Sequence, residues 1–384
     1  MSKRTFNLPE IFDAKIETAL QACGYSVSSP KKLADAVLRL SDHYTQHPLA
    51  ASPWKESWAQ AASIAYYFPL NYARNRAVAN EATRLGFFEG LNHLIDVGSG
   101  MGPALFAFAE AHSFATAHAV DHSSDGLALA QALNAKEINF RTEVADITVT
   151  MERLKKAEPP SKTLLTASYV LTELINTPQL IYGFEALAII EPSTSADARQ
   201  LMLLRQQLID KGFQIWGPCT HQGACPLLTH SAKDWCHDRI HWQAPDWWMK
   251  IESHLPMKNR TLTYSYLLAR RELAPPYKMR ELSRLTGDML VEKGKTRQSF
   301  CRSEAREFLS WFPQRMAKTE QLELQRGSLV SFTKPLADYE MRSAELRLKS
   351  TTDITELGPL ENLAANSAET CTDIFGTNSI GVKT

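Results

Sequence analysis

Three cysteines and three histidines lie within the short stretch GPCTHQGACPLLTHSAKDWCH, residues 217–237. Five residues separate Cys219 from Cys225, and ten separate Cys225 from Cys236. The chain has no apolar run long enough to cross a membrane, and its start resembles neither a signal peptide nor a transit peptide, so we expect a cytoplasmic protein. Structural disulfides are rare in the cytoplasm, and clustered thiols there indicate metal binding or catalysis.

The spacing of these cysteines limits the metal groups that they could bind. Zinc ribbons and knuckles use paired ligands about two to four residues apart, closer than any pair here. The CxxxCxxC pattern of radical S-adenosylmethionine enzymes is also absent. Three thiolates on a loop with a distant fourth, Cys301, suit the larger footprint of a 4Fe–4S cluster. Spacing alone leaves the metal open: zinc, with His221, His230 and His237 as further ligands, and a chance group of reduced thiols are the alternatives.

A second candidate site is the glycine turn in LIDVGSGMG, residues 94–102. An apolar run reaches Asp96, and Gly98, Gly100 and Gly102 follow before a helical pattern begins. Glycines let the backbone approach a ligand closely, and the N–H groups at the start of a helix point toward that ligand. The GxGxG spacing differs from the GxGxxG of nicotinamide-binding folds. With an acid before the first glycine, the turn suits S-adenosylmethionine, whose methionine carboxylate needs a donor and whose amine needs an acceptor.

Two further acids end the next strand-like runs. Asp121, in HAVDHS, is a candidate for binding both ribose hydroxyls of the same cofactor. Asp146, in EVADI, stands where class I methyltransferases often contact the adenine amine. The alternative is that both acids only cap the helices that follow them.

No catalytic motif is visible in the sequence. The stretch SYVLTE, residues 168–173, lacks both the Asp/Asn-Pro-Pro-aromatic motif of amino methyltransferases and the nucleophilic cysteine of cytosine-C5 enzymes. Tyr169 or Glu173 could act as a base, and each could equally be a packing or capping residue. The catalytic residues are therefore unknown at this stage.

The elements that must position these residues alternate between strands and helices. After a helical region over residues 1–90, strand-like runs alternate with helical patterns over residues 91–216. This alternation predicts an α/β domain with a parallel, doubly wound sheet, the Rossmann-like fold of class I S-adenosylmethionine-dependent methyltransferases. Residues 217–340 hold the inserted cysteine-rich lobe, late strands and a β-hairpin in GDMLVEKGKTRQSFCR. We expect residues 341–384, which are poor in aromatics, to form a disordered acidic tail.

Charge is balanced overall but not locally. The formal net charge is +0, so no global field attracts nucleic acid. From Lys258 to Arg306, twelve Lys or Arg stand against five Asp or Glu, a surplus of seven. Lys293, Lys295 and Arg297 of the hairpin are the candidate contacts for RNA phosphates, and the alternative is an ordinary solvated face.

The cysteine stretch resembles the Pro-Cys-x-His-x-Gly-x-Cys-Pro…Asp-Trp-Cys-His signature of the methyltransferase-like small-ribosomal-subunit assembly factors of mitochondria and their bacterial relatives. Further matches follow in family order over roughly residues 65–335: the glycine turn, Glu191-Pro192, YSYL near Arg270, and Cys301 after the hairpin. The chain departs from the family at Ser193, where Glu-Pro-Gly-Thr is usual, and in the tryptophans that follow Cys236.

This resemblance implies a 4Fe–4S cluster on Cys219, Cys225, Cys236 and Cys301, and the maturing small ribosomal subunit with its RNA as the partner. Our first hypothesis is therefore a ribosome assembly or translation factor that binds S-adenosylmethionine, the cluster and ribosomal RNA. The alternative is an active methyltransferase of ribosomal RNA, and a third hypothesis is a redox or iron sensor whose cluster gates RNA binding.

Overall fold

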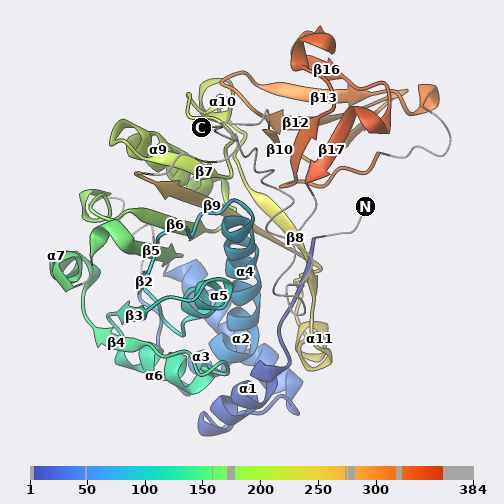
Figure 1. Cartoon of the computed structure of the whole chain (residues 1–384). Helices are drawn as coiled ribbons and strands as arrows, with labels where there is room; N and C mark the ends of the chain where they lie inside the picture. Colours follow the sequence, from blue (N-terminus) through green and yellow to red (C-terminus); the bar gives the residue numbers. More distant parts are fainter. Residues whose placement is uncertain are drawn as a thin grey trace, which may run out of the picture.

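The computed structural model of the chain describes residues 4–357, except residues 48–49, 158, 171–177, 273–274, 276–281 and 317–321. Two β-sheets dominate this part of the chain, and Figure 1 shows the second sheet, orange to red, above the first. Glu173 and the part of the predicted tail beyond Leu357 lie outside the described residues. Among the described residues, no helix has the length and apolar character that a membrane span needs.

Five parallel strands form the centre of the first sheet, in the order β4-β3-β2-β5-β6. Parallel strands require crossover connections, and helices placed between successive strands supply them. Because these helices cover the faces of the sheet, β5 (TLLTAS) and β6 (ALAIIE) are almost entirely buried. The bounds are β2 (His93–Val97), α5 (Pro103–Ala111), β3 (Thr116–Asp121), α6 (Ser124–Leu133), β4 (Arg141–Val144), α7 (Ile147–Ala157), β5 (Thr163–Ser168), β6 (Ala186–Glu191) and α9 (Ser195–Asp210).

Two late strands complete this core. β9 (Thr261–Arg270) is antiparallel to β6, and β7 (Gln214–Gly217) pairs antiparallel with β9. β9, the seventh strand of this core in sequence order, therefore lies antiparallel between β6, the fifth, and β7, the sixth. This is the strand order of class I S-adenosylmethionine-dependent methyltransferases, and it confirms the predicted Rossmann-like fold class.

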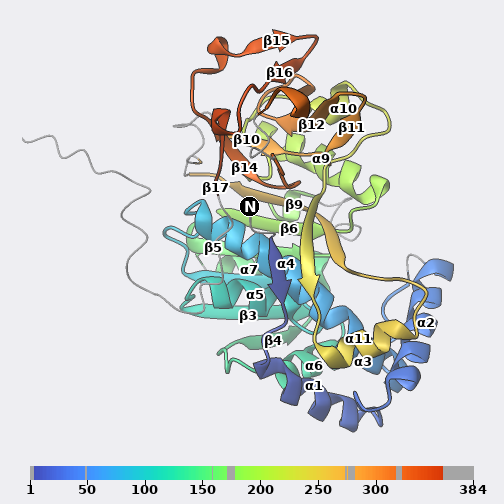
Figure 2. The same ribbon diagram turned by 90° about the vertical axis from the view of Figure 1, so that its right-hand side faces the viewer.

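The cysteine-rich stretch leaves the sheet where β7 ends. β7 pairs with the Leu268–Arg270 end of β9, whereas β8 (Asp238–Gln243) pairs with its Thr261–Tyr264 end. Residues 218–237 therefore connect two strands that meet opposite ends of β9. Figure 2 shows β8 beside β1 (Thr5–Asn7), which pairs with it in parallel and extends the sheet with the N-terminal segment.

The region predicted as helical, residues 1–90, consists mainly of helices that pack on the core. α4 packs on α5, α1 contacts α6, and α2 contacts α11. The Tyr66 ring stacks on Trp248 of α11 with centroids 5.0 Å apart, which explains one tryptophan of the segment that follows Cys236. The bounds are α1 (Ile11–Ala22), α2 (Pro30–Gln46), α3 (Ser57–Ala62), a π-helical turn (Ser63–Tyr67), α4 (Phe68–Arg84) and α11 (Asp246–Ser253).

The second sheet has its own core, which includes Leu285, Phe300, Leu309 and Leu346. The predicted hairpin is confirmed: β11 and β12 pair antiparallel around Gly294. The strand order is β15-β16-β13-β12-β10-β14-β17, with β11 on β12. The bounds are β10 (Leu282–Leu285), β11 (Leu290–Glu292), β12 (Lys295–Cys301), β13 (Glu307–Trp311), β14 (Leu329–Phe332), β15 (Glu340–Arg342), β16 (Glu345–Arg347) and β17 (Ile354–Leu357).

The predicted tail begins too early. β15, β16 and β17 lie within residues 340–357, so the expectation of a disordered segment from residue 341 is wrong as far as Leu357. These strands are short and polar, but Leu346, Leu348 and Ile354 are buried in the core of the second sheet. β15 buries no residue and β16 buries only Leu346, which is too weak a signal for a strand pattern in the sequence.

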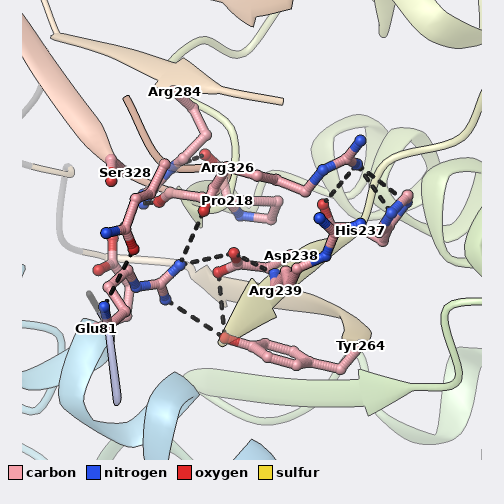
Figure 3. Close-up of polar contacts among 12 residues, drawn as sticks. Glu81, Pro218, His237, Asp238, Arg239, Tyr264, Arg284, Arg326 and Ser328 are labelled. Atoms are coloured by element: carbon pink, nitrogen blue, oxygen red, sulfur yellow. Dashed lines mark hydrogen bonds and ion pairs between the residues drawn. The ribbon is translucent and has the colours of Figure 1, made fainter. Parts of the chain in front are cut away.

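A buried arginine joins the two sheets (Figure 3). Arg284 of β10 forms an ion pair with Glu81 of α4, with Nη2 2.5 Å from Oε1. Its Nε donates to the carbonyl oxygen of Pro218 at 3.0 Å, and its Nη1 donates to that of Gly327 at 2.8 Å. Arg284 also lies opposite Cys301 of β12 in the strand register. One guanidinium therefore connects the helical layer, the start of the cysteine loop and the second sheet.

A second buried pair stands beside the first. Arg4 Nη1 lies 2.6 Å from Asp238 Oδ1 at the start of β8, and the Tyr264 hydroxyl donates to Asp238 Oδ2 at 3.1 Å (Figure 3). The backbone N–H of Arg4 also donates to Gln325 at 3.1 Å, so the N-terminal strand reaches the second sheet. Together the two pairs fix how the sheets meet.

The state of Glu81 follows from its neighbours. Burial alone would raise its pKa, but the guanidinium groups of Arg284 and Arg84 lower the pKa of Glu81 to about 2. Glu81 is therefore ionised at neutral pH and balances the buried charge of Arg284. A folded-state pKa below the ordinary 4.5 gives stability that is complete above that pH and is lost as the pH falls toward 2.

Replacing Glu81 with Gln should lower the free energy of unfolding at pH 7 by about 3–5 kcal/mol, because Arg284 loses its counter-charge while it stays buried. The difference from wild type should shrink as the pH falls from about 4.5 to 2, where wild-type Glu81 also becomes neutral. Urea denaturation at several pH values measures both effects. The control is Glu152→Gln, because the Glu152 side chain is 70% exposed in its pair with Lys155, and an equal loss in the two variants would contradict the assignment.

Candidate metal centre and cofactor turn

All four predicted ligand cysteines line a single cavity of about 50 Å³. Cys219 follows β7, and Cys225 precedes the short helix α10 (Pro226–Thr229). Cys236 precedes β8, and Cys301 is the last residue of β12. The cavity thus receives three sulfurs from the loop of the first sheet and one from the second sheet. The sequence indicated Cys301 as a distant fourth ligand, and the structure places it at the same cavity as the other three cysteines.

The turn after β12 holds Cys301 against the loop. Thr220 Oγ1 donates to the carbonyl oxygen of Cys301 at 3.0 Å. Glu304 Oε1 accepts from the backbone N–H of Ala224 at 2.9 Å. The same Glu304 carboxylate lies so close to Gly223 that a Cβ there would meet it at 2.2 Å, so a side chain at residue 223 would force Glu304 to move. These contacts set the loop and the end of β12 around one space.

The thiols in this cavity are costly to ionise without a cation. Burial, followed by the charges of the other cysteines, raises the pKa of Cys225, Cys236 and Cys301. Among the described residues, no three His, Cys, Asp or Glu side chains lie close enough together to hold a single metal ion. The four cysteines line one cavity in the described part of the chain, and which metal group they bind stays a prediction. A cationic iron–sulfur core would lower the pKa of such thiols.

The three histidines of the loop differ in their positions. His221 and His237 line the cavity, and His221 Nε2 lies 3.4 Å from Cys301 Sγ. His237 Nε2 lies 2.9 Å from Arg326 Nη1, a cation that disfavours metal binding by this ring. His230 instead lies with Nε2 3.2 Å from the carbonyl oxygen of Glu304. Of the alternative zinc ligands, His221 is therefore the one beside a sulfur.

The glycine turn has the backbone geometry that its sequence predicts. Gly98, Gly100 and Gly102 have φ values of 62°, 51° and 79°, which favour glycine. At Gly98 an added Cβ would meet Val170 Cγ1 at 2.1 Å, and at Gly100 it would meet the Trp54 ring at 3.5 Å. At Gly102 an added Cβ would meet the Phe106 ring at 3.2 Å, so protein side chains lie against all three glycines. Trp54, which the sequence did not single out, is part of the surface that a ligand at this turn would contact.

The acids predicted to bind the cofactor have structural partners. Asp96 is buried on β2, where its carboxylate accepts from the hydroxyls of Ser99 at 2.7 Å and Thr166 at 2.6 Å. Burial raises the pKa of Asp96 to about 6, although these two hydroxyls oppose the shift. Asp96 therefore holds the turn through its bond to Ser99, and its predicted contact with a cofactor stays a prediction.

Asp121 and Asp146 differ in exposure. Asp121, at the end of β3, is only 4% exposed, and its oxygens accept from the N–H groups of Gly100 and Ser123, each at 2.8 Å. Each carboxylate oxygen has a second lone pair, so ribose hydroxyls can still be accepted. Asp146 is exposed and accepts from the N–H of Thr148 at 2.7 Å in the first turn of α7, as the capping alternative predicted.

The end of β5 holds the one candidate base within the described residues. Tyr169 has φ of 64°, an uncommon value for a residue with a side chain. Burial raises the pKa of its hydroxyl, and Arg74 opposes that shift. A tyrosine of raised pKa stays protonated at neutral pH and is a poor general base.

The basic residues of the hairpin form more ion pairs with acidic residues than the sequence predicted. Lys295 Nζ lies 3.0 Å from Glu345 on β16, and Arg297 lies 2.7 Å from Glu292 and 3.8 Å from Glu345. Lys293, by contrast, is exposed near the turn. The sequence reading missed Glu345 because it assigned that residue to the tail. The positive surface at this hairpin is therefore smaller than the charge count suggested.

Comparison with known proteins gives one family match. The model of the family described as "Mitochondrial small ribosomal subunit Rsm22" matches residues 58–310, which include the glycine turn and all four cysteines. None of the curated proteins matches the chain.

Solved structures resemble the chain only weakly. Precorrin-6y C5,15-methyltransferase from Geobacter metallireducens matches with 10% identity and a TM-score of 0.32, covering 52% of this chain and 89% of its own. M. capricolum TrmK in complex with S-adenosyl-homocysteine matches with 12% identity and a TM-score of 0.31, covering 51% and 69%. Ribosomal protein L11 methylase from Lactobacillus delbrueckii subsp. bulgaricus matches with 15% identity and a TM-score of 0.30, covering 51% and 77%.

Replacing Asp121 with Asn should lower the free energy of unfolding by about 1–3 kcal/mol without any cofactor present, because an amide has one acceptor oxygen for two buried N–H groups. The matched control is Asp146→Asn, which should be nearly neutral because Asn caps helices as well as Asp does. Denaturant titration of both variants tests this difference. Equal stability of the two would show that Asp121 does not hold the glycine turn.

Proposed function

The chain belongs to the family described as mitochondrial small ribosomal subunit Rsm22, and from that premise we propose that it is a small-subunit assembly or translation factor. In this proposal a methyltransferase-like core binds S-adenosylmethionine, and Cys219, Cys225, Cys236 and Cys301 hold a 4Fe–4S cluster. The partner is the small ribosomal subunit with its RNA. The family description is mitochondrial, and the cytoplasmic location expected from the sequence stays a prediction.

The observation that carries the proposal is the meeting of four cysteines from two sheets at one cavity. Cysteines brought together across 82 positions, Cys219 to Cys301, have no packing reason to share one space. A cluster bonded to all four would link the loop, which has little core of its own, to the second sheet. When bound, the cluster would supply a cationic iron–sulfur core to which four cysteine thiolates can bond. The protein supplies the cavity and the contacts of Thr220 and Glu304 that orient the loop.

The core supports cofactor binding less directly. The glycine turn lies at the carboxyl end of β2, where ligands of open α/β sheets bind. Asp121 follows on the neighbouring strand with acceptor capacity left for ribose hydroxyls. Trp54 lies against Gly100, so the ligand would have to pack beside this ring or displace it.

Active methylation of ribosomal RNA is the second candidate, and the observation in its favour is the contact of Val170, just after β5, with Gly98 of the turn. This contact brings the usual catalytic strand end next to the proposed cofactor. The protonated Tyr169 does not supply a base, so the assembly role is preferred. Transfer of a labelled methyl group to small-subunit RNA would reverse that preference.

Anaerobically purified wild-type protein should be brown, with absorbance near roughly 400 nm and about four iron atoms per chain. Cys225→Ser should lose most of the iron, because one of four bonds to the cluster is removed. The matched control is Cys23→Ser, since Cys23 lies away from the cavity and donates to Gln60 at 3.1 Å. Metal analysis and absorption spectra report the outcome. A colourless wild-type protein with one tightly bound zinc would refute the cluster.

RNA binding should depend on Lys293 more than on its paired neighbours. Lys293→Ala should flatten the slope of log affinity against log salt by up to about one unit, the contribution of one phosphate contact. Glu345→Gln should steepen that slope, because Lys295 and Arg297 lose a counter-charge.

Filter binding of small-subunit RNA fragments at several salt concentrations measures both slopes. Lys15→Ala is the control, an exposed lysine on α1 at the opposite end of the molecule from the hairpin (Figure 1). The hairpin is not the RNA contact if Lys293→Ala and Lys15→Ala give the same slope.

A further inference from the structure

Within the described part of the chain, three arginines line the cysteine cavity, and they differ in how their charge is balanced. Arg284 is paired with Glu81, and Arg306 lies 2.5 Å from Asp234. Arg205 of α9 has no carboxylate within ion-pair distance among the described residues. It is nevertheless only 2% exposed. A buried cation without a counter-charge costs several kcal/mol, on the order that removal of one partner of a buried pair reveals.

The contacts of Arg205 point to the sulfur side of the cavity. Its Nε donates to Cys219 Sγ at 3.1 Å, and its Nη2 donates to the carbonyl oxygen of His221 at 2.8 Å. Its Nη1 is buried and has no hydrogen-bond partner in the structure. Burial alone would lower the pKa of Arg205, but the charge of Cys219 and, to a smaller extent, of Cys225 and Cys301 raises it.

We infer that Arg205 is the counter-ion of the four-cysteine metal group, holding Cys219 as a ligand and favouring the more negative state of the bound group. The inference rests on the proposed function, because it needs a metal group in the cavity. Four thiolates around a cluster core leave a net negative charge, which the guanidinium balances in a site that excludes water. Arg205 is a positioning residue, because it acts through the thiolate and the field around it.

A redox consequence follows from this placement. Reduction adds one electron, and hence one negative charge, to the bound cluster. A cation at hydrogen-bond distance from a ligand sulfur stabilises the reduced state more than the oxidised state, so it raises the reduction potential. The effect is strong because the site is buried and salt screens buried charges little.

The experiment compares Arg205→Gln with Arg199→Gln in the full chain, purified anaerobically. Arg199 is a matched control: it lies on the same helix, and its hydrogen bonds among the described residues go to the carbonyl oxygens of Ser231 and Asp234 in the same loop rather than to a cysteine. Iron and sulfide content are measured first. The reduction midpoint then comes from a dye-mediated titration with dithionite, followed by absorption and electron paramagnetic resonance.

In Arg205→Gln the reduction equilibrium should shift at least tenfold toward the oxidised cluster, which is 59 mV in the midpoint for one electron. Iron should also be lost faster to a chelator. Arg199→Gln should keep the wild-type midpoint. Equal midpoints and equal iron loss in wild type and Arg205→Gln would overturn the inference.

Two outcomes separate this inference from the proposed function. If wild-type protein holds no iron, the proposed function itself is contradicted. If the protein holds iron but wild type and Arg205→Gln have the same reduction midpoint, only the role of Arg205 as counter-ion is contradicted. If Arg205→Gln does not fold, the same measurements on Arg205→Lys test the inference instead. Lysine keeps the charge but cannot hold both Cys219 and the His221 carbonyl in one rigid fork. It should retain iron with a smaller downward shift, and no shift would overturn the inference.

Discussion

The guanidinium of Arg284 is the contact on which the arrangement of this molecule depends. It bonds Glu81 of the helical layer, the carbonyl oxygen of Pro218 where the cysteine loop begins, and the carbonyl oxygen of Gly327 in the second sheet. Because Arg284 lies opposite Cys301 in the strand register, the same contact that docks the second sheet also brings the fourth cysteine to the loop. A buried ion pair adds little net stability compared with apolar packing, but a broken one costs several kcal/mol, so the pair favours a single docking geometry.

Charge balance extends from this contact into the cavity. Arg284 and Arg306 are neutralised by Glu81 and Asp234, whereas Arg205 faces Cys219 without a carboxylate among the described residues. The thiols in turn have pKa values raised by burial and mutual repulsion, so they would remain neutral without a cation. The buried arginine without a carboxylate is unfavourable, whereas neutral buried thiols are not. In the proposed function, a metal group bonded to the cysteines would ionise the sulfurs, and Arg205 would then balance their charge.

The core was predictable from the sequence because its strands are apolar runs separated by helical patterns, and because Gly98, Gly100 and Gly102 occupy backbone positions that need glycine. The cysteine signature indicated the candidate metal ligands, and the structure brings these cysteines to one cavity. The rest depended on contacts between distant segments. Glu345, which pairs with Lys295, stands in a polar stretch that looks like a tail, because its strand buries only Leu346. Arg205 lies in an ordinary amphipathic helix, where no pattern distinguishes a buried arginine from an exposed one.

The central claim is that cysteines from both sheets bind one iron–sulfur cluster and so join the two parts of the chain. Native mass spectrometry of anaerobically purified protein tests it most directly, with wild type and Cys301→Ser compared. The account predicts that wild type carries the added mass of about four irons and four sulfides, and that Cys301→Ser loses it while the core stays folded. A single zinc on wild type, or the same cluster mass retained by Cys301→Ser, would contradict the account.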